Sequence, residues 1–176
     1  FTEHALARLD AMTAGDDPWF LTVAYNAPHD PVAQGAAWIR DAASSDHPDA
    51  ARYAELIEDC EEPDNRTDGS DFCLLTAHLD LHLGRLLDAA PDNALVIVMS
   101  DNGGQINLGA SNAHLRGEKG NIFNGGTMVP LLVRGPDIPV NEVSDAPITT
   151  SEFFPTILDF FGIAAPEAQD LSLIHI

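Results

Sequence analysis

The chain has 176 residues, enough for one domain with a buried core and too few for two domains of ordinary size. Hydrophobic residues make up 45% and charged residues 20%, a globular balance that excludes disordered, collagen-like and coiled-coil proteins. The formal net charge of −20 would repel nucleic-acid phosphates and anionic lipids, and no apolar run reaches the roughly 20 residues of a membrane helix. We therefore expect neither a nucleic acid nor a membrane as a partner, and the sequence leaves the oligomeric state open.

The first part of the chain is expected to contain two amphipathic helices and one buried strand. Apolar side chains recur at helical spacing over residues 2–13 and again over 51–60. Residues 19–25 form a nearly unbroken apolar run, a pattern typical of a strand that is buried on both faces. The stretch 61–71 is polar, acidic and rich in turn-forming residues, so we predict a surface loop there.

Helices and strands continue to alternate in the second part of the chain. A stripe of leucines predicts a helix over residues 72–89, and the apolar runs 94–99 and 129–133 predict two further strands. The last helix is expected to be capped by Thr150 or Ser151. Buried strands that alternate with amphipathic helices predict an α/β fold with a mainly parallel sheet.

The two cysteines say little about chemistry. Neither Cys60 nor Cys73 has metal-binding side chains at a suitable spacing, and a single pair cannot build a disulfide-dense scaffold. Cys60 lies on the apolar stripe of the helix predicted over 51–60, so we predict a buried thiol at this position. The sequence leaves open whether the two cysteines pair.

The loop after the strand at 94–99 carries the first candidate site. Asp101 and Asn102 follow this strand and precede Gly103 and Gly104. A carboxylate beside an amide offers two oxygen donors of the kind that Ca²⁺ or Mg²⁺ prefers, and ligands of open α/β sheets bind at the carboxyl ends of strands. The same residues are also typical of an ordinary turn, because Asn-Gly is a strong turn dipeptide.

The second candidate is His29, in the loop formed by residues 26–31. Pro28 and Pro31 stiffen this loop and hold the histidine at the C-terminal end of the first predicted strand. Such a position suits a proton donor or an anion contact, whereas the alternative is a solvent-exposed histidine without a role.

The third candidate is Lys119, the only lysine of the chain. Between residues 111 and 134 there are three basic side chains and one acidic side chain, so this segment has a net charge of +2 within a chain of −20. A locally basic segment can hold an anionic group that the rest of the surface repels. The alternative is a solvated loop, which leaves the position of the lysine between glycines unexplained.

Four ordered segments resemble the formylglycine-dependent sulfatases of the alkaline-phosphatase superfamily. They are PWFLTVAYNAPHDP (18–31), HLDLHLGRLLDAAPDNALVIVMSDNGG (78–104), LRGEKGNIFNGGTMVPLLVRGP (115–136) and TSEFFPTILDFFGI (150–163). They cover most of the chain outside residues 32–71, and their order makes the match more specific than any single motif. The resemblance implies a partial alkaline-phosphatase-like α/β/α sandwich with a mainly parallel sheet.

The resemblance also implies roles for the candidate residues. Asp101 and Asn102 would be metal ligands, usually to Ca²⁺ with Mg²⁺ as the alternative, and Lys119 and His29 would contact the sulfate ester. In this family a formylglycine attacks sulfur, and the covalent sulfate intermediate then collapses to release inorganic sulfate. We assign proton donation to the leaving alcohol to His29, with help from Lys119. Glu118 stands where relatives commonly have glycine.

One expected part of the family's site does not occur in the chain. The nucleophile derives from a C-x-P-x-R or S-x-P-x-R motif, and neither cysteine stands in that setting. We therefore interpret residues 1–170 as the C-terminal portion of a sulfatase catalytic domain, with 32–71 as a variable insertion or loop region. The formylglycine and further metal-binding aspartates are expected upstream, and the chain alone is expected to be inactive. Residues 171–176 resemble translated adapter sequence and are interpreted as a non-native tail.

The expected function of the full-length parent is hydrolysis of a sulfate ester on a small molecule or a glycan. One alternative is a phosphodiesterase or phosphonate hydrolase of the same superfamily. The other is a non-catalytic metal-binding relative that has lost the nucleophile. Because such sulfatases are usually exported, we expect a periplasmic or secreted protein rather than a cytoplasmic one.

Overall fold

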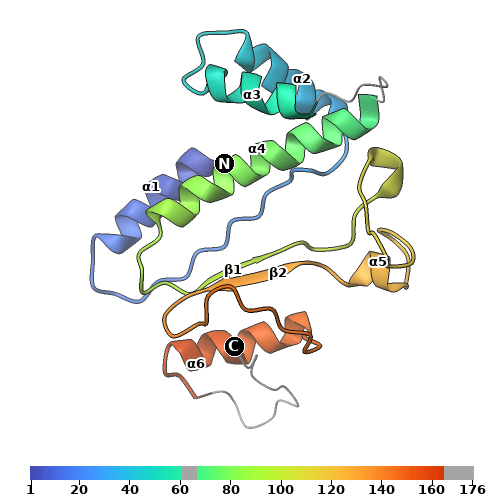
Figure 1. The fold of residues 1–176 in the computed structure, drawn as a ribbon. Coiled ribbons are helices and arrows are strands. Elements are labelled where there is room, and N and C mark those ends of the chain that lie inside the picture. Colours follow the sequence, from blue (N-terminus) through green and yellow to red (C-terminus); the bar gives the residue numbers. More distant parts are fainter. Residues whose placement is uncertain (61–66, 165–176) are drawn as a thin grey trace.

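The computed structural model describes residues 1–60 and 67–164 (Figure 1). The elements in chain order are α1 (Thr2–Thr13), α2 (Val32–Ala43), α3 (Ala50–Cys60), α4 (Thr67–Ala89), β1 (Val96–Met99), η1 (Ile106–Leu108), α5 (Asn124–Thr127), β2 (Leu131–Arg134), η2 (Thr150–Glu152) and α6 (Phe153–Phe160). The helices expected over 2–13 and 51–60 are confirmed. The loop expected over 61–66 and the non-native tail expected at 171–176 lie outside the described residues.

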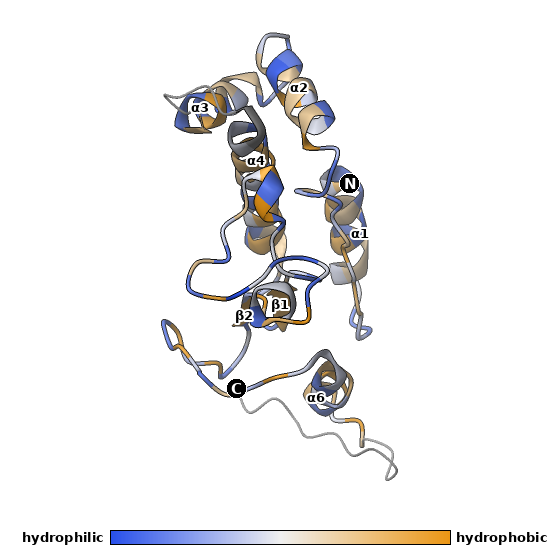
Figure 2. Ribbon diagram, turned by 90° about the vertical axis from the view of Figure 1, so that its right-hand side faces the viewer, coloured by the Kyte–Doolittle hydropathy of each residue, from blue (hydrophilic) through white to orange (hydrophobic). Residues whose placement is uncertain are grey.

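Helices cover the strand pair from two sides. The long helix α4 lies on one side of β1 and β2, and α6 lies on the other side, in both views of the ribbon (Figures 1 and 2). Arg134 at the end of β2 ties the pair to α4, because its guanidinium donates a hydrogen bond of 2.9 Å to the carbonyl oxygen of Leu87. The expected α/β/α layering is therefore present. None of the described helices is long and apolar enough to cross a membrane.

The strand direction differs from the sequence-based expectation of a mainly parallel sheet. Within the described residues the sheet has two strands, and β1 pairs with β2 in the antiparallel direction, from Val96 opposite Arg134 to Met99 opposite Leu131. The connection between the two strands contains only the short helices η1 and α5. Parallel neighbours are usually joined by a long crossover helix, which this connection lacks, so the chain returns along β1 in the opposite direction.

The segment 19–25 was expected to be a strand buried on both faces, and it is not. It runs as an extended stretch along the molecule from α1 toward α2, without ladder partners among the described residues (Figure 1). Its side chains alternate between half-buried and exposed, and Phe20 is 61% exposed. The period of two is that of a strand, but a strand becomes part of a sheet only through a hydrogen-bonded neighbour.

The densest part of the core lies between α2, α3 and α4. Helix α2 was not anticipated, because it falls in the region 32–71 that matched no family segment. The three helices share a cluster of buried side chains: Val32, Ala36, Ile39, Ala42, Tyr53, Leu56, Cys60, Leu74 and Leu75. Burial of such side chains contributes about 1.5–3 kcal/mol for each large aliphatic residue, so this cluster is the main source of stability in the N-terminal half.

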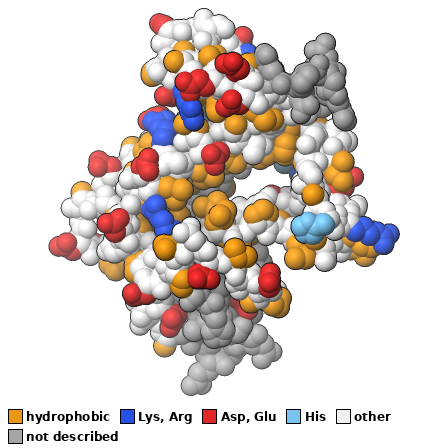
Figure 3. Space-filling model, in the orientation of Figure 1, with side chains coloured by type: hydrophobic (Ala, Val, Ile, Leu, Met, Phe, Trp, Pro, Cys, Tyr) orange, Lys and Arg blue, Asp and Glu red, His pale blue; other side chains and the backbone are white. Residues whose placement is uncertain are grey.

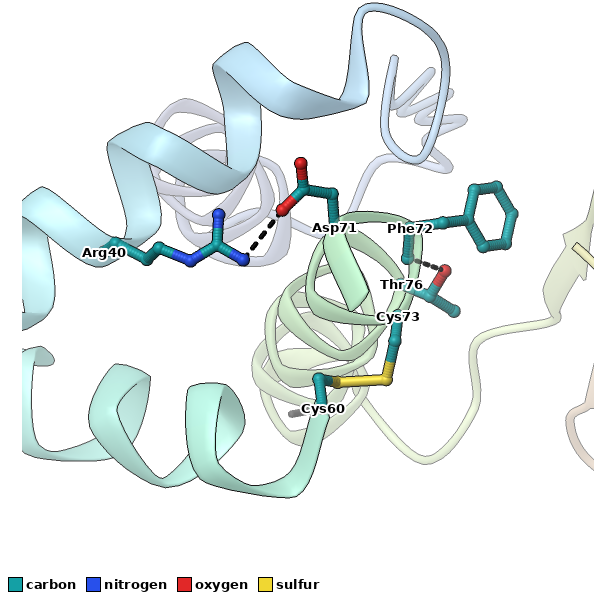
Figure 4. The surroundings of a disulfide bond; sticks show 6 residues. All are labelled: Arg40, Cys60, Asp71, Phe72, Cys73 and Thr76. Carbon is teal, nitrogen blue, oxygen red and sulfur yellow. Dashed lines mark hydrogen bonds and ion pairs between the residues drawn. A yellow bond between two sulfur atoms is a disulfide. The ribbon is translucent and has the colours of Figure 1, made fainter. Parts of the chain in front are cut away.

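A disulfide and an ion pair connect the start of α4 to α3 and α2 (Figure 4). Cys60 and Cys73 form a disulfide, so the prediction of a thiol at Cys60 is wrong, although its burial is confirmed. Helix α4 begins at Thr67, within the predicted surface loop 61–71, and Asp71 is buried. Its carboxylate pairs with the Arg40 guanidinium at 2.7 Å, which explains how a charged residue from an acidic stretch can be enclosed.

The last helical segment starts one residue earlier than predicted. Thr149, rather than Thr150 or Ser151, is the N-cap of η2, which continues into α6. Thr149 and Glu152 form a capping box, in which the Glu152 carboxylate accepts a hydrogen bond of 2.6 Å from the Thr149 backbone N–H. This reciprocal arrangement satisfies two N–H groups that a helix start would otherwise leave without partners.

Candidate functional site

The loop after β1 presents the acid–amide pair at the end of a core strand. Asp101 is exposed and Asn102 is half-buried. The hydroxyl of Ser100 donates a hydrogen bond of 2.8 Å to the backbone carbonyl oxygen of Asn102 and so fixes the turn that separates the two side chains from β1. The pair therefore lies at the carboxyl end of a strand, where ligands of α/β proteins usually bind.

Beyond this turn, two loop segments and the short helix α5 meet backbone against backbone. We call the residues at which they meet, Gly103, Gly104, Gly117, Gly125 and Gly126, the glycine junction. The Gly103 N–H donates to the Gly126 carbonyl oxygen at 3.0 Å, and the Gly125 N–H donates to the Arg116 carbonyl oxygen at 2.7 Å. A methyl group on Gly103 would overlap the carbonyl oxygen of Gly125, and one on Gly125 would overlap that of Gly117. The close approach therefore requires residues without a β-carbon.

The glycine junction brings the loop of Lys119 to the loop of the acid–amide pair. The backbone N–H of Lys119 donates a hydrogen bond of 3.3 Å to the carbonyl oxygen of Gly104, two residues after Asn102. Lys119 itself is half-buried, and its neighbour Gly120 has a positive φ of 84°. Lys119 and the pair Asp101–Asn102 thus lie on loops that are joined directly.

Two residues that were not singled out as functional hold these loops in place. The Asn112 side chain accepts from the Gly104 N–H at 2.9 Å and donates to the carbonyl oxygens of Gly104 and Gly117 at 2.9 and 3.2 Å. The Glu118 carboxylate accepts a hydrogen bond of 2.7 Å from the Ile106 N–H. The sequence signal for Glu118 was its replacement of the usual glycine, and for Asn112 there was only the general richness of this segment in asparagine.

His29 lies in a separate loop with its own hydrogen bonds. Its backbone N–H donates to the Asn26 carbonyl oxygen at 2.8 Å, and its Nδ1 lies 2.7 Å from the carbonyl oxygen of Asp30. Since a carbonyl oxygen only accepts, Nδ1 carries the proton, which leaves Nε2 of the exposed ring as the atom that can exchange a proton with a ligand. No hydrogen bond within residues 1–60 and 67–164 joins this loop to that of Lys119.

The donor chemistry of Asp101 and Asn102 suits a hard cation. A carboxylate oxygen and an amide oxygen are two of the six to eight oxygen ligands that Ca²⁺ takes. No cluster of three or more His, Cys, Asp or Glu residues that could hold a metal ion exists in the described part of the chain. The chemistry of the two side chains thus fits part of a calcium site.

The surface next to the Lys119 loop combines basic and apolar side chains. A shallow hollow of about 320 Å³ is lined by His114, Leu115, Arg116, Ile122, Phe123 and Asn124. The Arg116 guanidinium lies over the Phe123 ring, 3.8 Å from its centre. Figure 3 shows that acidic side chains are spread over the helices of this face and outnumber the basic ones. The hollow is therefore a cationic region on an acidic molecule, in agreement with the local charge of the sequence.

Comparison with known proteins decides the family. The family model of the sulfatases matches residues 1–163. The chain belongs to the sulfatase family. A sulfatase of Formosa agariphila shares 30% identity over 125 residues, which cover 61% of this chain and 22% of that protein. Arylsulfatase J of Mus musculus shares 30% identity over 138 residues, which cover 77% of this chain and 21% of that protein.

A solved structure supports the same assignment for the fold of the sulfatase chain. The crystal structure of Ps i-CgsB in complex with k-i-k-neocarrahexaose matches it with a TM-score of 0.75 and 27% sequence identity. The match covers 98% of this chain and 35% of that chain. The expected sulfatase-type fold is thus confirmed, and the chain spans only a minor part of the length of the relatives that it matches.

Proposed function

We propose that the full-length parent of this chain hydrolyses sulfate esters and that the chain supplies part of the metal and sulfate site. Membership of the sulfatase family supports the reaction class. The observation that carries the proposal is the hydrogen bond between the Lys119 N–H and the Gly104 carbonyl oxygen, because it joins the only lysine to the loop of the acid–amide pair. A cation site and an ammonium group on joined loops can both contact the oxygens of one sulfate group.

Asp101 and Asn102 are the residues that would hold the metal ion, Ca²⁺ or, as the alternative, Mg²⁺. The exposed Asp101 carboxylate supplies a charged oxygen ligand, and the Asn102 amide supplies a neutral one. When bound, the ion supplies positive charge that stabilises negative charge on the sulfate oxygens. The remaining ligands, and the formylglycine nucleophile that attacks sulfur, are proposed to come from upstream parts of the parent.

Lys119 and His29 are proposed to act on the sulfate ester itself. The Lys119 ammonium is the group that neutralises charge on the sulfate oxygens as the ester bond breaks. The His29 ring, oriented by its Nδ1–H donation to Asp30, would give the Nε2 proton of its imidazolium form to the departing alcohol oxygen. This proton transfer would avoid the release of an alkoxide, and the ring would regain a proton from solvent.

We propose a small-molecule or glycan sulfate ester as the substrate class and an exported location for the protein. The neighbour Ps i-CgsB is bound to k-i-k-neocarrahexaose, which supports a glycan. Arylsulfatase J of Mus musculus and the choline-sulfatase of Rhizobium meliloti are relatives whose names refer to smaller sulfate esters. The disulfide Cys60–Cys73 supports a periplasmic or secreted location, because such bonds persist in oxidising compartments.

The proposal is tested on the full-length parent with Lys119→Ala and His29→Gln, assayed with an aryl sulfate. Loss of an electrostatic stabiliser of this kind lowers kcat by about 10²–10³-fold, and loss of a general acid by about 10²–10⁴-fold. The exposed Arg8 on α1 provides a matched control, since Arg8→Ala also removes one positive charge and should leave kcat unchanged. Wild-type turnover in Lys119→Ala, or equal activity of the parent on aryl phosphate and aryl sulfate, contradicts the proposal.

A further inference from the structure

Two histidines whose chemistry suits metal binding lie on α4, the helix that precedes β1 and the loop of Asp101. His78 and His82 stand one turn apart on α4, and their Nε2 atoms are 3.1 Å from each other. The ring centres are 4.4 Å apart, farther than the two nitrogen atoms. The nitrogen-bearing edges of the two rings therefore converge on one point.

This point is enclosed by residues from α2, α3 and the turn between them. The Tyr53 hydroxyl lies 3.5 Å from Nε2 of His82, and the Trp38 ring meets the His78 ring edge-on with 5.9 Å between centres. Burial, and then the negative charge of Asp49, raise the pKa of the Tyr53 hydroxyl. His47 stacks near Tyr53, with ring centres 5.1 Å apart. The surroundings thus offer one hydroxyl beside the two imidazoles.

We propose that His78 and His82 bind one divalent transition-metal ion, of the Cu²⁺, Ni²⁺ or Zn²⁺ class, through their Nε2 atoms. Bonds of about 2.0–2.1 Å to one ion put two nitrogen ligands about 2.9 Å apart at a right angle and about 3.4 Å apart at a tetrahedral angle. The Nε2–Nε2 distance of 3.1 Å lies between these values, so the ion enters without a change of backbone. Water and the Tyr53 hydroxyl complete the coordination.

This site differs in kind from the one proposed at Asp101. Imidazole nitrogen suits copper, nickel and zinc, whereas carboxylate and amide oxygens suit calcium and magnesium. The negative charge of the chain also favours a bound cation.

Arg85 carries a positive charge next to His82 and should weaken the binding of a metal ion there. Its Nη1 lies 3.4 Å from Nδ1 of His82, and since arginine only donates, this contact keeps the His82 proton on Nε2, between the two rings. Metal binding moves that proton to Nδ1 and turns the guanidinium away, while Arg85 keeps its ion pair with Glu3 at 2.6 Å. Removal of the guanidinium should therefore strengthen metal binding.

The test is a titration of the metal-free chain with NiCl₂, CuCl₂ and ZnCl₂ at pH 7.5, with Trp38 fluorescence as the readout. Trp19→Phe in all samples leaves Trp38 as the only indole. We expect quenching by Ni²⁺ and Cu²⁺ that saturates at one ion per chain, and no response to CaCl₂. His78→Gln and His82→Gln should each weaken the apparent Kd at least tenfold, and Arg85→Leu should tighten it severalfold. The matched control His4→Gln, at an exposed histidine of α1, should change nothing.

A second measurement keeps the test decisive if a histidine variant fails to fold. The electron paramagnetic resonance spectrum of the unsubstituted chain with one equivalent of Cu²⁺ should show two coordinated imidazole nitrogens. A spectrum with one nitrogen or none overturns the proposal. A Kd for Ni²⁺ that is the same in His78→Gln as in the unsubstituted chain also overturns it. The two rings would then only share a hydrogen bond.

Discussion

We call the buried side chains shared by α2, α3 and α4 the helical cluster. The helical cluster and the glycine junction are stabilised by different kinds of contact. Around α2, α3 and α4, large side chains such as Ile39 and Leu74 are almost fully buried, and the buried Asp71 carboxylate pairs with the exposed Arg40 guanidinium. Around the glycine junction, the buried residues are Gly103, Gly125 and Gly126, and the contacts are backbone hydrogen bonds. The first region depends on side-chain volume, and the second depends on the absence of side chains.

This difference separates stability from function. The helical cluster contributes most of the apolar burial among the described residues, whereas the glycine junction contributes little burial but joins the Lys119 loop to the loop of the acid–amide pair. Substitutions in the helical cluster should therefore unfold the chain. Substitutions in the glycine junction should disturb the loops first.

The largest effect is expected from Leu74→Ala in the helical cluster. Leu74 is 1% exposed, so the substitution leaves a cavity and should lower the free energy of unfolding by about 2–5 kcal/mol. Leu132→Ala on β2 is the matched control, because Leu132 is 63% exposed and the same atoms are lost from a solvated position. Urea unfolding followed by circular dichroism measures both, and equal losses would contradict the contrast between regions.

The disulfide should contribute next in size. Its two cysteines are 13 positions apart, and closing a loop of this length restricts the unfolded chain by about 3 kcal/mol. Reduction, or the double replacement Cys60→Ala with Cys73→Ala, should lower the urea midpoint accordingly. Adding reductant to the double variant should not change the urea midpoint further. If reductant also leaves the urea midpoint of the unsubstituted chain unchanged, the bond is absent.

Gly125→Ala should change the free energy of unfolding less than the two preceding variants, but it should clearly disturb the loops of the glycine junction. The new methyl group would overlap the carbonyl oxygen of Gly117, so the loops must move apart at a cost of about 1–3 kcal/mol. Amide exchange at Gly103 and Lys119 should accelerate more than exchange in α4. Gly15→Ala, where a methyl group meets nothing within 4 Å, is the control. Unchanged exchange at Lys119 in Gly125→Ala would argue against the glycine junction.

The smallest effect concerns pH and the helical cluster alone. Because the pKa of His78 is lowered from 6.5 to about 4 when folded, the unfolded chain binds more protons between these values. Stability from this group is complete above pH 6.5 and is lost as the pH falls toward 4, by at most about 2 kcal/mol after solvent screening. His78→Gln should flatten this part of the pH profile relative to His4→Gln, and parallel profiles would contradict the assignment.

The sequence predicted elements whose signal is local. The bounds of α1 agree with its apolar spacing, and β1 falls within the run 94–99. The pairing of strands could not be predicted in the same way, because it depends on residues that are distant in sequence. The segment 19–25 has the composition of a buried strand, but no strand among the described residues pairs with it. The side chains of β1 are likewise half-buried or exposed rather than fully buried.

The residues of the candidate site could be predicted from the sequence, but the contacts that hold their loops in place could not. The loop positions of Asp101 and Lys119 followed from motif and charge, and their roles stay predictions. The fit of Gly103 against Gly125 and Gly126 could not be inferred, since backbone contacts leave no periodic pattern. The disulfide was equally hidden, because its formation depends on how α3 packs against α4.

The most direct test of the central claim is a crystal structure of the full-length parent with Ca²⁺ and inorganic sulfate. We expect the ion on Asp101 and Asn102, and one sulfate that contacts both the ion and the Lys119 ammonium within about 3 Å, with His29 on the same anion. A sulfate held by other residues, with the side chains of Asp101 and Lys119 directed to opposite sides of the molecule, would contradict the account.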